Sequence, residues 1–305
     1  MPKIYKISKK VSLPVNEMEI KDKDFIPKKV PFENHRTVIE QVAIGINYGM
    51  PVLLIGETGT GKTSIVRHLA HETGNAFVRV NHNGGTTVED IVGRYTLDEN
   101  GTVWNDGILI KAMREGYWYL ADEINACSPE INFIYHSLLD DDGRVILVEK
   151  GHEVVIPHPN FRFFGGMNPT TEYSGTKEMN KALTSRFAVV KVDFLPPKIE
   201  AKVVADRAGV PYEVAERMVK VAVEIRSSHA KGNTRFVIST RDLIMWAHNY
   251  RMHDKYLASA ETAVLNKIPD EDFQAVSDLF GLHFKTLDTG KATVSTEIET
   301  DSITI

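Results

Sequence analysis

Two short segments of the sequence carry residues whose types and spacing suit phosphate chemistry. The first, GETGTGKT at residues 56–63, follows the apolar run PVLLI and precedes the amphipathic stretch TSIVRHLAHETG. It satisfies the pattern G-x-x-x-x-G-K-[ST] with a strand before it and a helix after it. Glycines let backbone N–H groups converge on phosphates, and the N-terminus of the following helix favours negative charge. The segment therefore predicts a loop that binds nucleotide phosphates.

Two positions of this loop have roles of their own. We expect Lys62 to offset the charge of the β and γ phosphates and Thr63 to ligate Mg²⁺. The complete set of nucleotide-binding candidates is Gly56, Glu57, Thr58, Gly59, Thr60, Gly61, Lys62, Thr63 and Ser64. The alternative is a glycine-rich turn with an exposed lysine. It is much the weaker interpretation, because it leaves the strand and the helix on either side unexplained.

The second segment, WYLADEIN, places Asp122 and Glu123 behind a run of apolar residues that starts at Tyr117. Two carboxylates at the end of a buried strand are costly unless a cation faces them. We expect Asp122 to hold the Mg²⁺ ion and Glu123 to polarise the attacking water. A solvated turn is the weaker alternative, given the phosphate loop upstream.

Three further polar residues fall where a hydrolytic site needs them, and each has an ordinary structural alternative. Asn168 follows FRFFGGM and could orient the lytic water, or it could form an Asn-Pro turn. Arg186, in NKALTSRFAVV, precedes a strand and could simply satisfy the dipole at the end of a short helix. Arg241 lies in the first turn of a helix capped by Ser239 or Thr240. A cation there opposes the helix dipole, so a phosphate is its expected partner.

Alternation of short apolar runs with helical patterns predicts the scaffold from about residue 36 to 195. The runs are VLLI (52–55), AFVRV (76–80), YWYLA (117–121), FRFFGGM (161–167) and AVVKVDF (188–194). Such alternation indicates an α/β domain with a parallel sheet covered on both faces. Behind the proline pair at 196–197, helical patterns near 198–207, 212–228, 239–253 and 256–267 predict a small helical domain. We expect a lead-in over 1–35, the α/β domain over 36–195, the helical domain over 196–284 and a tail over 285–305.

Two β-hairpins are expected inside the α/β domain. In RYTLDENGTVWNDG, Tyr95 and Leu97 precede a DENG turn, and Val103 and Trp104 follow it. In RVILVEKGHEVVIP, branched apolar residues lie on both sides of EKGH. A plain surface loop is the alternative for the first segment.

Composition excludes several classes of protein. The 305 residues include 36 Lys and Arg against 41 Asp and Glu, a formal net charge of −5 that offers no global attraction to nucleic acid or an anionic membrane. Cys127 is the single cysteine, which excludes an internal disulfide framework and a multi-cysteine metal site. No apolar run approaches the roughly 18 residues that span a bilayer. We therefore expect a cytoplasmic protein.

The segments GETGTGKT, LADEIN, GGMNP and EMNKALTSRF, in this order, resemble the AAA+ ATPases of the MoxR-like group, also called the helix-2-insert group. The run from DGILIKAMREG to HPNFRFFGGMNP is most similar to the CbbQ, NorQ and cobaltochelatase-small-subunit-like branch. The resemblance covers residues from about 36 to 250. It implies a P-loop NTPase AAA+ module, with a five-stranded parallel sheet of order 5-1-4-3-2, β-hairpin insertions and a small α-helical lid domain.

The resemblance also implies roles for the candidate residues, with ATP and Mg²⁺ as cofactors. They are the Walker A lysine at Lys62 with Thr63 on Mg²⁺, Walker B at Asp122 and Glu123, sensor 1 at Asn168, an arginine finger at Arg186 and sensor 2 at Arg241. An arginine finger acts in trans, so the family implies a homo-oligomeric ring, usually a hexamer.

The implied function is ATP hydrolysis that remodels or activates a partner protein, as in metal insertion or enzyme activation with a partner that carries a von Willebrand factor A-type (VWA) domain. Two alternatives stay open. A nucleic-acid-directed NTPase motor is disfavoured by the acidic net charge and the lack of a basic stripe. A nucleotide-gated assembly scaffold with little turnover is disfavoured by the complete set of catalytic candidates.

Overall fold

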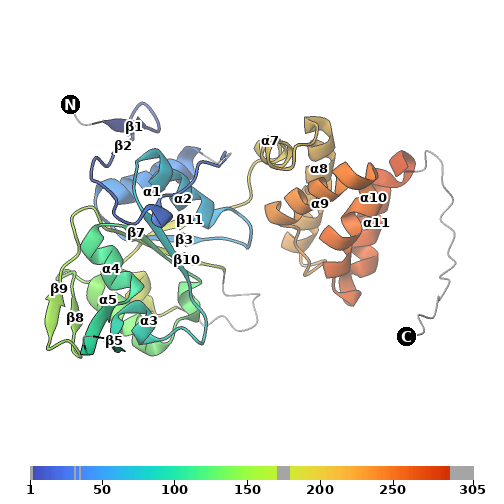
Figure 1. Cartoon of the computed structure of the whole chain (residues 1–305). Coiled ribbons are helices and arrows are strands. Elements are labelled where there is room, and N and C mark those ends of the chain that lie inside the picture. Colours follow the sequence, from blue (N-terminus) through green and yellow to red (C-terminus); the bar gives the residue numbers. More distant parts are fainter. Residues whose placement is uncertain (1–2, 31, 34–35, 100, 170–178, 289–305) are drawn as a thin grey trace. The chain divides into compact units, whose positions relative to one another are not determined.

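The computed structural model describes residues 3–30, 32–33, 36–99, 101–169 and 179–288 (Figure 1). The chain divides into two compact units, Met1–Leu195 and Pro196–Ile305. Each unit has a hydrophobic core of its own. Among the described residues, no helix combines the length and the apolar character needed to cross a membrane.

Five parallel strands form the central sheet of the first unit, in the order β11-β3-β10-β7-β4. Their bounds are β3 (Val52–Ile55), β4 (Phe77–Asn81), β7 (Trp118–Asp122), β10 (Arg162–Met167) and β11 (Ala188–Lys191). Counted along the chain, the order is 5-1-4-3-2, which confirms the fold class that the resemblance implies. Because the strands are parallel, the residues that follow β3, β7 and β10 all lie at the same end of the sheet, where the strands have their carboxyl ends.

Both faces of this sheet are covered by helices (Figure 1). The helices of the unit are α1 (Arg36–Asn47), α2 (Lys62–Glu72), α3 (Val88–Ile91), α4 (Ile108–Glu115), α5 (Pro129–Leu138) and α6 (Lys181–Thr184), with short 3₁₀ turns at Lys23–Phe25 and Ile124–Ala126. Trp118 and Leu120 pack in the core that contains α1 and α2, whereas Tyr119 and Ala121 pack in the core that contains α4 and α5. Side chains alternate along a strand, so a strand buried on both faces is apolar throughout.

Among the described residues, three two-stranded hairpins accompany the sheet. They are β1 (Ile4–Lys6) with β2 (Ser12–Pro14), β5 (Gly93–Asp98) with β6 (Gly101–Asp106), and β8 (Val145–Leu147) with β9 (Glu153–Val155). The second and third confirm the hairpins that the sequence predicts, and Tyr95 faces Trp104 across the second. The hairpin β1-β2 was not predicted. Leu13, only 1% exposed, anchors it in the core, a tertiary contact that the weak local pattern did not indicate.

The second unit is entirely helical in its described part. Its elements are α7 (Pro197–Ala208), α8 (Tyr212–Ala230), α9 (Thr240–His253), α10 (Tyr256–Ala263), a 3₁₀ turn at Leu265–Lys267 and α11 (Asp270–Asp288). The sequence analysis overlooked α11, although Val276, Phe280 and Phe284 recur every four residues and are buried. This helix also continues past Lys285, where we expected a tail to begin. Residues 289–305 of the predicted tail lie outside the described part of the chain.

A buried ion pair joins three helices of the second unit. Glu200 on α7 is 0% exposed, and its carboxylate accepts hydrogen bonds from Arg226 Nη1 at 2.7 Å and Nη2 at 2.9 Å. Thr240 at the start of α9 donates to the same carboxylate at 2.6 Å. A buried carboxylate tolerates this position only while its charge is matched and its oxygens are hydrogen-bonded.

Replacing Arg226 with methionine is therefore expected to lower the free energy of unfolding by about 3 kcal/mol, because it leaves the Glu200 charge buried and unmatched. Urea-induced unfolding of the full chain, followed by circular dichroism, measures the shift in midpoint. Arg235→Met is the control, since that side chain is 83% exposed and pairs with exposed Glu271. Little change is expected for the control. Equal midpoints for the two variants would contradict a structural role for the buried pair.

Candidate active site

The predicted phosphate loop connects β3 to α2. Gly59 and Gly61 adopt φ angles of 81° and 96°, a region that favours glycine. A Cβ atom at Gly56 would overlap the carbonyl oxygen of Val192, so no side chain fits there. Gly61 is the N-cap of α2, and the helix begins at Lys62. The loop therefore ends on a helix N-terminus, where backbone N–H groups and the helix dipole favour a bound phosphate.

Lys62 points back across this loop. Its Nζ atom donates to the carbonyl oxygens of Gly56 at 2.6 Å and Glu57 at 3.0 Å, and to Asn168 Oδ1 at 2.8 Å. Only 8% of the residue is exposed. The contact with Asn168 links the loop to the end of β10, 106 positions later in the chain.

Asp122 is the last residue of β7 and lies beside α2. Thr63 Oγ1 donates to Asp122 Oδ2 at 3.0 Å, so the two predicted Mg²⁺ ligands are in contact. A Cβ atom at Gly166 would lie 2.6 Å from Asp122 Oδ1. Glycine at 166 on β10 therefore leaves the room that this carboxylate occupies. The sequence analysis did not assign Gly166, although the Gly-Gly pair within an otherwise apolar strand pattern is a signal for a close approach.

Arg79 on β4 is a second residue that the sequence analysis missed. Its Nε atom donates to Asp122 Oδ2 at 2.7 Å, and its Nη2 atom lies 2.6 Å from the same oxygen. The Asp122 side chain is 6% exposed, whereas that of Arg79 is 47% exposed. An arginine within the strand run AFVRV, which is otherwise apolar, was the available signal.

Glu123 and Asn168 complete the cluster. Asn168 Nδ2 donates to Glu123 Oε1 at 3.0 Å, while its Oδ1 accepts from Lys62. Glu123 has a φ angle of 54°, which is uncommon for a residue with a side chain and turns the backbone sharply after β7. Burial, followed by the neighbouring Asp122 charge, raises the pKa of the Glu123 carboxyl above its usual range. The environment thus favours a carboxylate that accepts a proton more readily than an exposed glutamate.

His82 supports the end of β7 from the neighbouring strand. Its backbone N–H donates to the carbonyl oxygen of Asp122 at 2.9 Å, and its Nε2 atom lies 2.7 Å from Tyr135 Oη. Tyr135 Oη in turn lies 2.9 Å from Tyr119 Oη. Burial lowers the pKa of His82 to about 4, so the ring is neutral at physiological pH. These contacts hold the backbone that carries Asp122 without adding charge to it.

The other side chains of the loop differ in exposure. Thr60 is buried and its Oγ1 donates to the carbonyl oxygen of Glu57 at 2.8 Å, which closes the turn. Thr58 is exposed, and Ser64 is half-buried in the first turn of α2.

Arg186 contacts other residues in the same unit. It follows α6, and its guanidinium reaches the carbonyl oxygen of Ala182 at 2.6 Å and Asp140 Oδ1 at 3.2 Å. Its Nε atom is buried without a hydrogen-bond partner. The described contacts of Arg186 thus lie outside the cluster around Lys62.

Arg241 belongs to the second unit. Ser239 is the N-cap of α9 and forms a capping box with Asp242, as the sequence allows. Arg241 is exposed in the first turn of this helix. Its role toward a phosphate stays a prediction.

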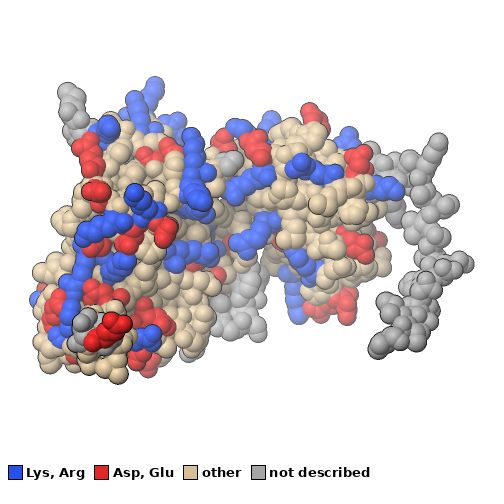
Figure 2. Space-filling model, in the orientation of Figure 1, with Lys and Arg blue, Asp and Glu red and all other residues tan. Residues whose placement is uncertain are grey.

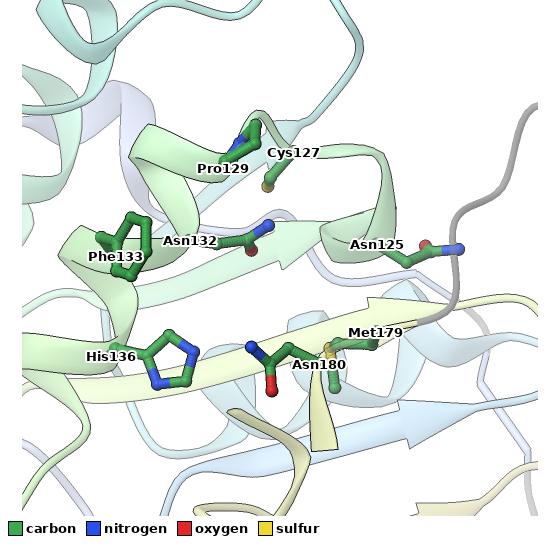
Figure 3. A pocket seen from close by; sticks show the side chains of 8 residues that line it. All are labelled: Asn125, Cys127, Pro129, Asn132, Phe133, His136, Met179 and Asn180. Carbon is green, nitrogen blue, oxygen red and sulfur yellow. The ribbon is translucent and has the colours of Figure 1, made fainter. Parts of the chain in front are cut away.

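A pocket of about 170 Å³ lies near α5 and the start of α6 (Figure 3). Its lining residues are Asn125, Cys127, Pro129, Asn132, Phe133, His136, Met179 and Asn180. Both amide atoms of the Asn125 side chain are buried without a hydrogen-bond partner. None of the predicted catalytic residues lines this pocket, so the chemistry is expected at the cluster around Lys62.

Comparisons with known proteins agree with this geometry. Residues 51–187 match the family model described as AAA domain (dynein-related subfamily), and residues 200–278 match the one described as CbbQ/NirQ/NorQ C-terminal. Protein CbbQ of Hydrogenophilus thermoluteolus is 34% identical over 223 residues, which cover 73% of this chain and 82% of CbbQ. The chain is a MoxR-like AAA+ ATPase. The sequence resemblance is thereby confirmed.

Two further relatives of this MoxR-like ATPase differ in size. The aerobic cobaltochelatase subunit CobS of a Sinorhizobium species is 28% identical over 264 residues, covering 80% of this chain and 79% of CobS. Midasin of Dictyostelium discoideum is 35% identical over 203 residues, covering 65% of this chain but only 3% of midasin. The chain thus spans most of CbbQ and CobS and a small part of midasin.

Proposed function

We propose that this ATPase works with Mg²⁺ as a homo-oligomeric ring of six subunits, and that its hydrolysis cycle remodels or activates a partner protein. The observation that carries the proposal is the cluster of polar side chains at the carboxyl ends of the strands. It joins Lys62 to Asn168 and Asn168 to Glu123, with Thr63 bonded to Asp122 beside them. Residues far apart in sequence thus meet where a phosphate loop ends on a helix.

The cluster fits a magnesium-bound triphosphate. Thr63 and Asp122 offer oxygen atoms, the ligands that Mg²⁺ takes in proteins. Space beside Gly61 is open, because a Cβ atom there would meet nothing within 4 Å. The positive charge of Lys62 lies at the base of the same loop. Bound Mg²⁺ would supply neutralisation of the phosphate charge that develops during hydrolysis.

Each residue then has a defined task. Lys62 and the N-terminus of α2 hold the phosphates, while Thr63 and Asp122 hold the metal. Glu123 accepts a proton from the attacking water at its carboxylate, and the Asn168 amide orients that carboxylate at 3.0 Å. Arg186 acts on the nucleotide of the neighbouring subunit, and Arg241 contacts the phosphates from the helical unit.

The proposed target is a protein, of the kind that carries a VWA domain, rather than nucleic acid. The relative CobS is a subunit of aerobic cobaltochelatase, which supports action together with partner proteins. Lys and Arg are interspersed with Asp and Glu on the faces shown in Figure 2, in line with the formal net charge of −5. Mixed charge of this kind on the drawn face does not favour binding of a phosphate backbone.

Purified protein is expected to hydrolyse ATP only with Mg²⁺, and Lys62→Ala should weaken ATP binding about 30-fold by removing a charge-assisted contact with phosphate. A fluorescent ATP analogue measures the binding, and phosphate release measures turnover. Lys21→Ala is the control, because that side chain is 74% exposed and pairs with Glu115.

No Mg²⁺-dependent turnover with candidate partners present would overturn the proposal. Stimulation by DNA or RNA would instead favour the nucleic-acid motor, and binding without single-turnover hydrolysis would favour the scaffold.

A further inference from the structure

We infer that Arg79 occupies the metal-binding oxygen of Asp122 when nucleotide is absent, and that Mg²⁺ must displace the Arg79 guanidinium to bind. Arg79 would thereby set how strongly Mg²⁺ tightens nucleotide binding. This inference rests on the proposed function, because it assigns a regulatory residue to the same nucleotide site.

Three donors already crowd one oxygen of Asp122. Arg79 Nε at 2.7 Å, Arg79 Nη2 at 2.6 Å and Thr63 Oγ1 at 3.0 Å all reach Oδ2. The other oxygen, Oδ1, faces the backbone at Gly166, where even a Cβ atom would lie only 2.6 Å away. A carboxylate oxygen has about two lone-pair sites, and the hydrogen bonds from Arg79 Nε and Thr63 Oγ1 use both of them, so none is left for a metal ion. Oδ2 must lose donors before it can ligate Mg²⁺ beside Thr63.

Electrostatic repulsion prevents Arg79 and Mg²⁺ from contacting Asp122 at the same time. A guanidinium and a divalent cation on one oxygen would repel each other strongly in this partly buried site. The Asp122 side chain is 6% exposed, so its charge requires a cation in either state. Arg79 provides that cation without nucleotide and is replaced by Mg²⁺ when nucleotide is bound.

The Arg79 side chain is exposed enough to move away from Asp122 into solvent. Its side chain is 47% exposed, so the guanidinium can leave Asp122 for water without crossing the core. The β4 backbone need not move, because Val80 and Asn81 stay paired with Ala121 and Asp122 in the sheet. Displacement is then a rotation of one long side chain, and its cost is subtracted from the binding energy of Mg²⁺.

The test measures the coupling between metal and nucleotide, without turnover. The dissociation constant of fluorescent ATPγS is measured in EDTA and in saturating Mg²⁺. The constant in EDTA divided by the constant in Mg²⁺ gives the coupling between metal and nucleotide. Arg79→Met should raise this ratio about tenfold, because Mg²⁺ no longer has to displace the Arg79 guanidinium from its charge-assisted hydrogen bond with Asp122. Arg144→Met is the matched control, because Arg144 is also 47% exposed and also pairs with an aspartate, Asp142. The control should keep the wild-type ratio.

The outcomes separate this inference from the proposed function. An unchanged or lower ratio in Arg79→Met overturns the inference while leaving the nucleotide site intact. Failure of the wild-type protein to bind the analogue in either buffer overturns the proposed function instead. Should Arg79→Met not fold, a structure of the wild-type complex with Mg²⁺ and ATPγS decides. The inference then requires Arg79 beyond hydrogen-bond distance of Asp122, and an intact pair beside bound Mg²⁺ overturns it.

Discussion

Glu123→Gln is expected to lower kcat for ATP hydrolysis about 1,000-fold while the dissociation constant for ATP changes little. Glutamine keeps the size of the side chain and can still accept the hydrogen bond from Asn168 Nδ2, which is 3.0 Å long in the native protein. It cannot accept the proton of the attacking water. The loss therefore falls on the chemical step, and phosphate release under saturating ATP measures it.

Glu216→Gln is the matched control for this variant, since Glu216 is on α8 and pairs with Lys220 at the surface. Its kcat should equal that of the native protein. A Glu123→Gln protein with native kcat would remove Glu123 from the reaction. A variant that lost ATP affinity in proportion to turnover would assign Glu123 to binding. If the variant stalls with ATP bound, it should also retain the partner protein in a pulldown from the native host.

Arg186→Ala should also lower kcat about 1,000-fold and leave ATP binding nearly intact, because an arginine finger stabilises charge that develops only in the transition state. Within its own subunit, Arg186 contacts Ala182 and Asp140, both outside the cluster around Lys62. Its buried Nε atom lacks a partner. The shared-site proposal therefore requires the guanidinium to exchange these contacts for the nucleotide of a neighbouring subunit.

Mixing two inactive variants tests that proposal. An Arg186→Ala subunit keeps its own Glu123, and an adjacent Glu123→Gln subunit keeps Arg186, so a mixed ring restores complete shared sites. We expect turnover to reappear on mixing, in proportion to the adjacent pairs formed. Size-exclusion chromatography verifies that both variants assemble. Assembled mixtures that stay inactive would contradict action in trans, and loss of ATP binding by Arg186→Ala would place that arginine in its own subunit's site.

Local spacing by itself determined the phosphate loop and the acid pair. The residues at 56–63 and at 122–123 each follow an apolar run, so their type and position are readable without knowing any long-range contact. The hairpins β5-β6 and β8-β9 were predictable for the same reason, since each turn lies between its own strands. The short β1-β2 hairpin and α11 escaped prediction. The first depends on burial of Leu13, and the second has a pattern that the sequence analysis did not follow past residue 267.

Only the tertiary structure decided what surrounds Asp122. Arg79 lies 43 positions before it and Gly166 follows 44 positions after Asp122, as the hydrogen bond and the strand register record. They meet because β7 pairs with β4 on one side and with β10 on the other. A local sequence pattern identifies the polar residues at the end of one strand. The side chains that contact those residues depend on which strands lie beside that strand and in which register. The sequence thus determined the residues proposed to bind phosphate and metal, and the order of the sheet determined which side chains lie beside them.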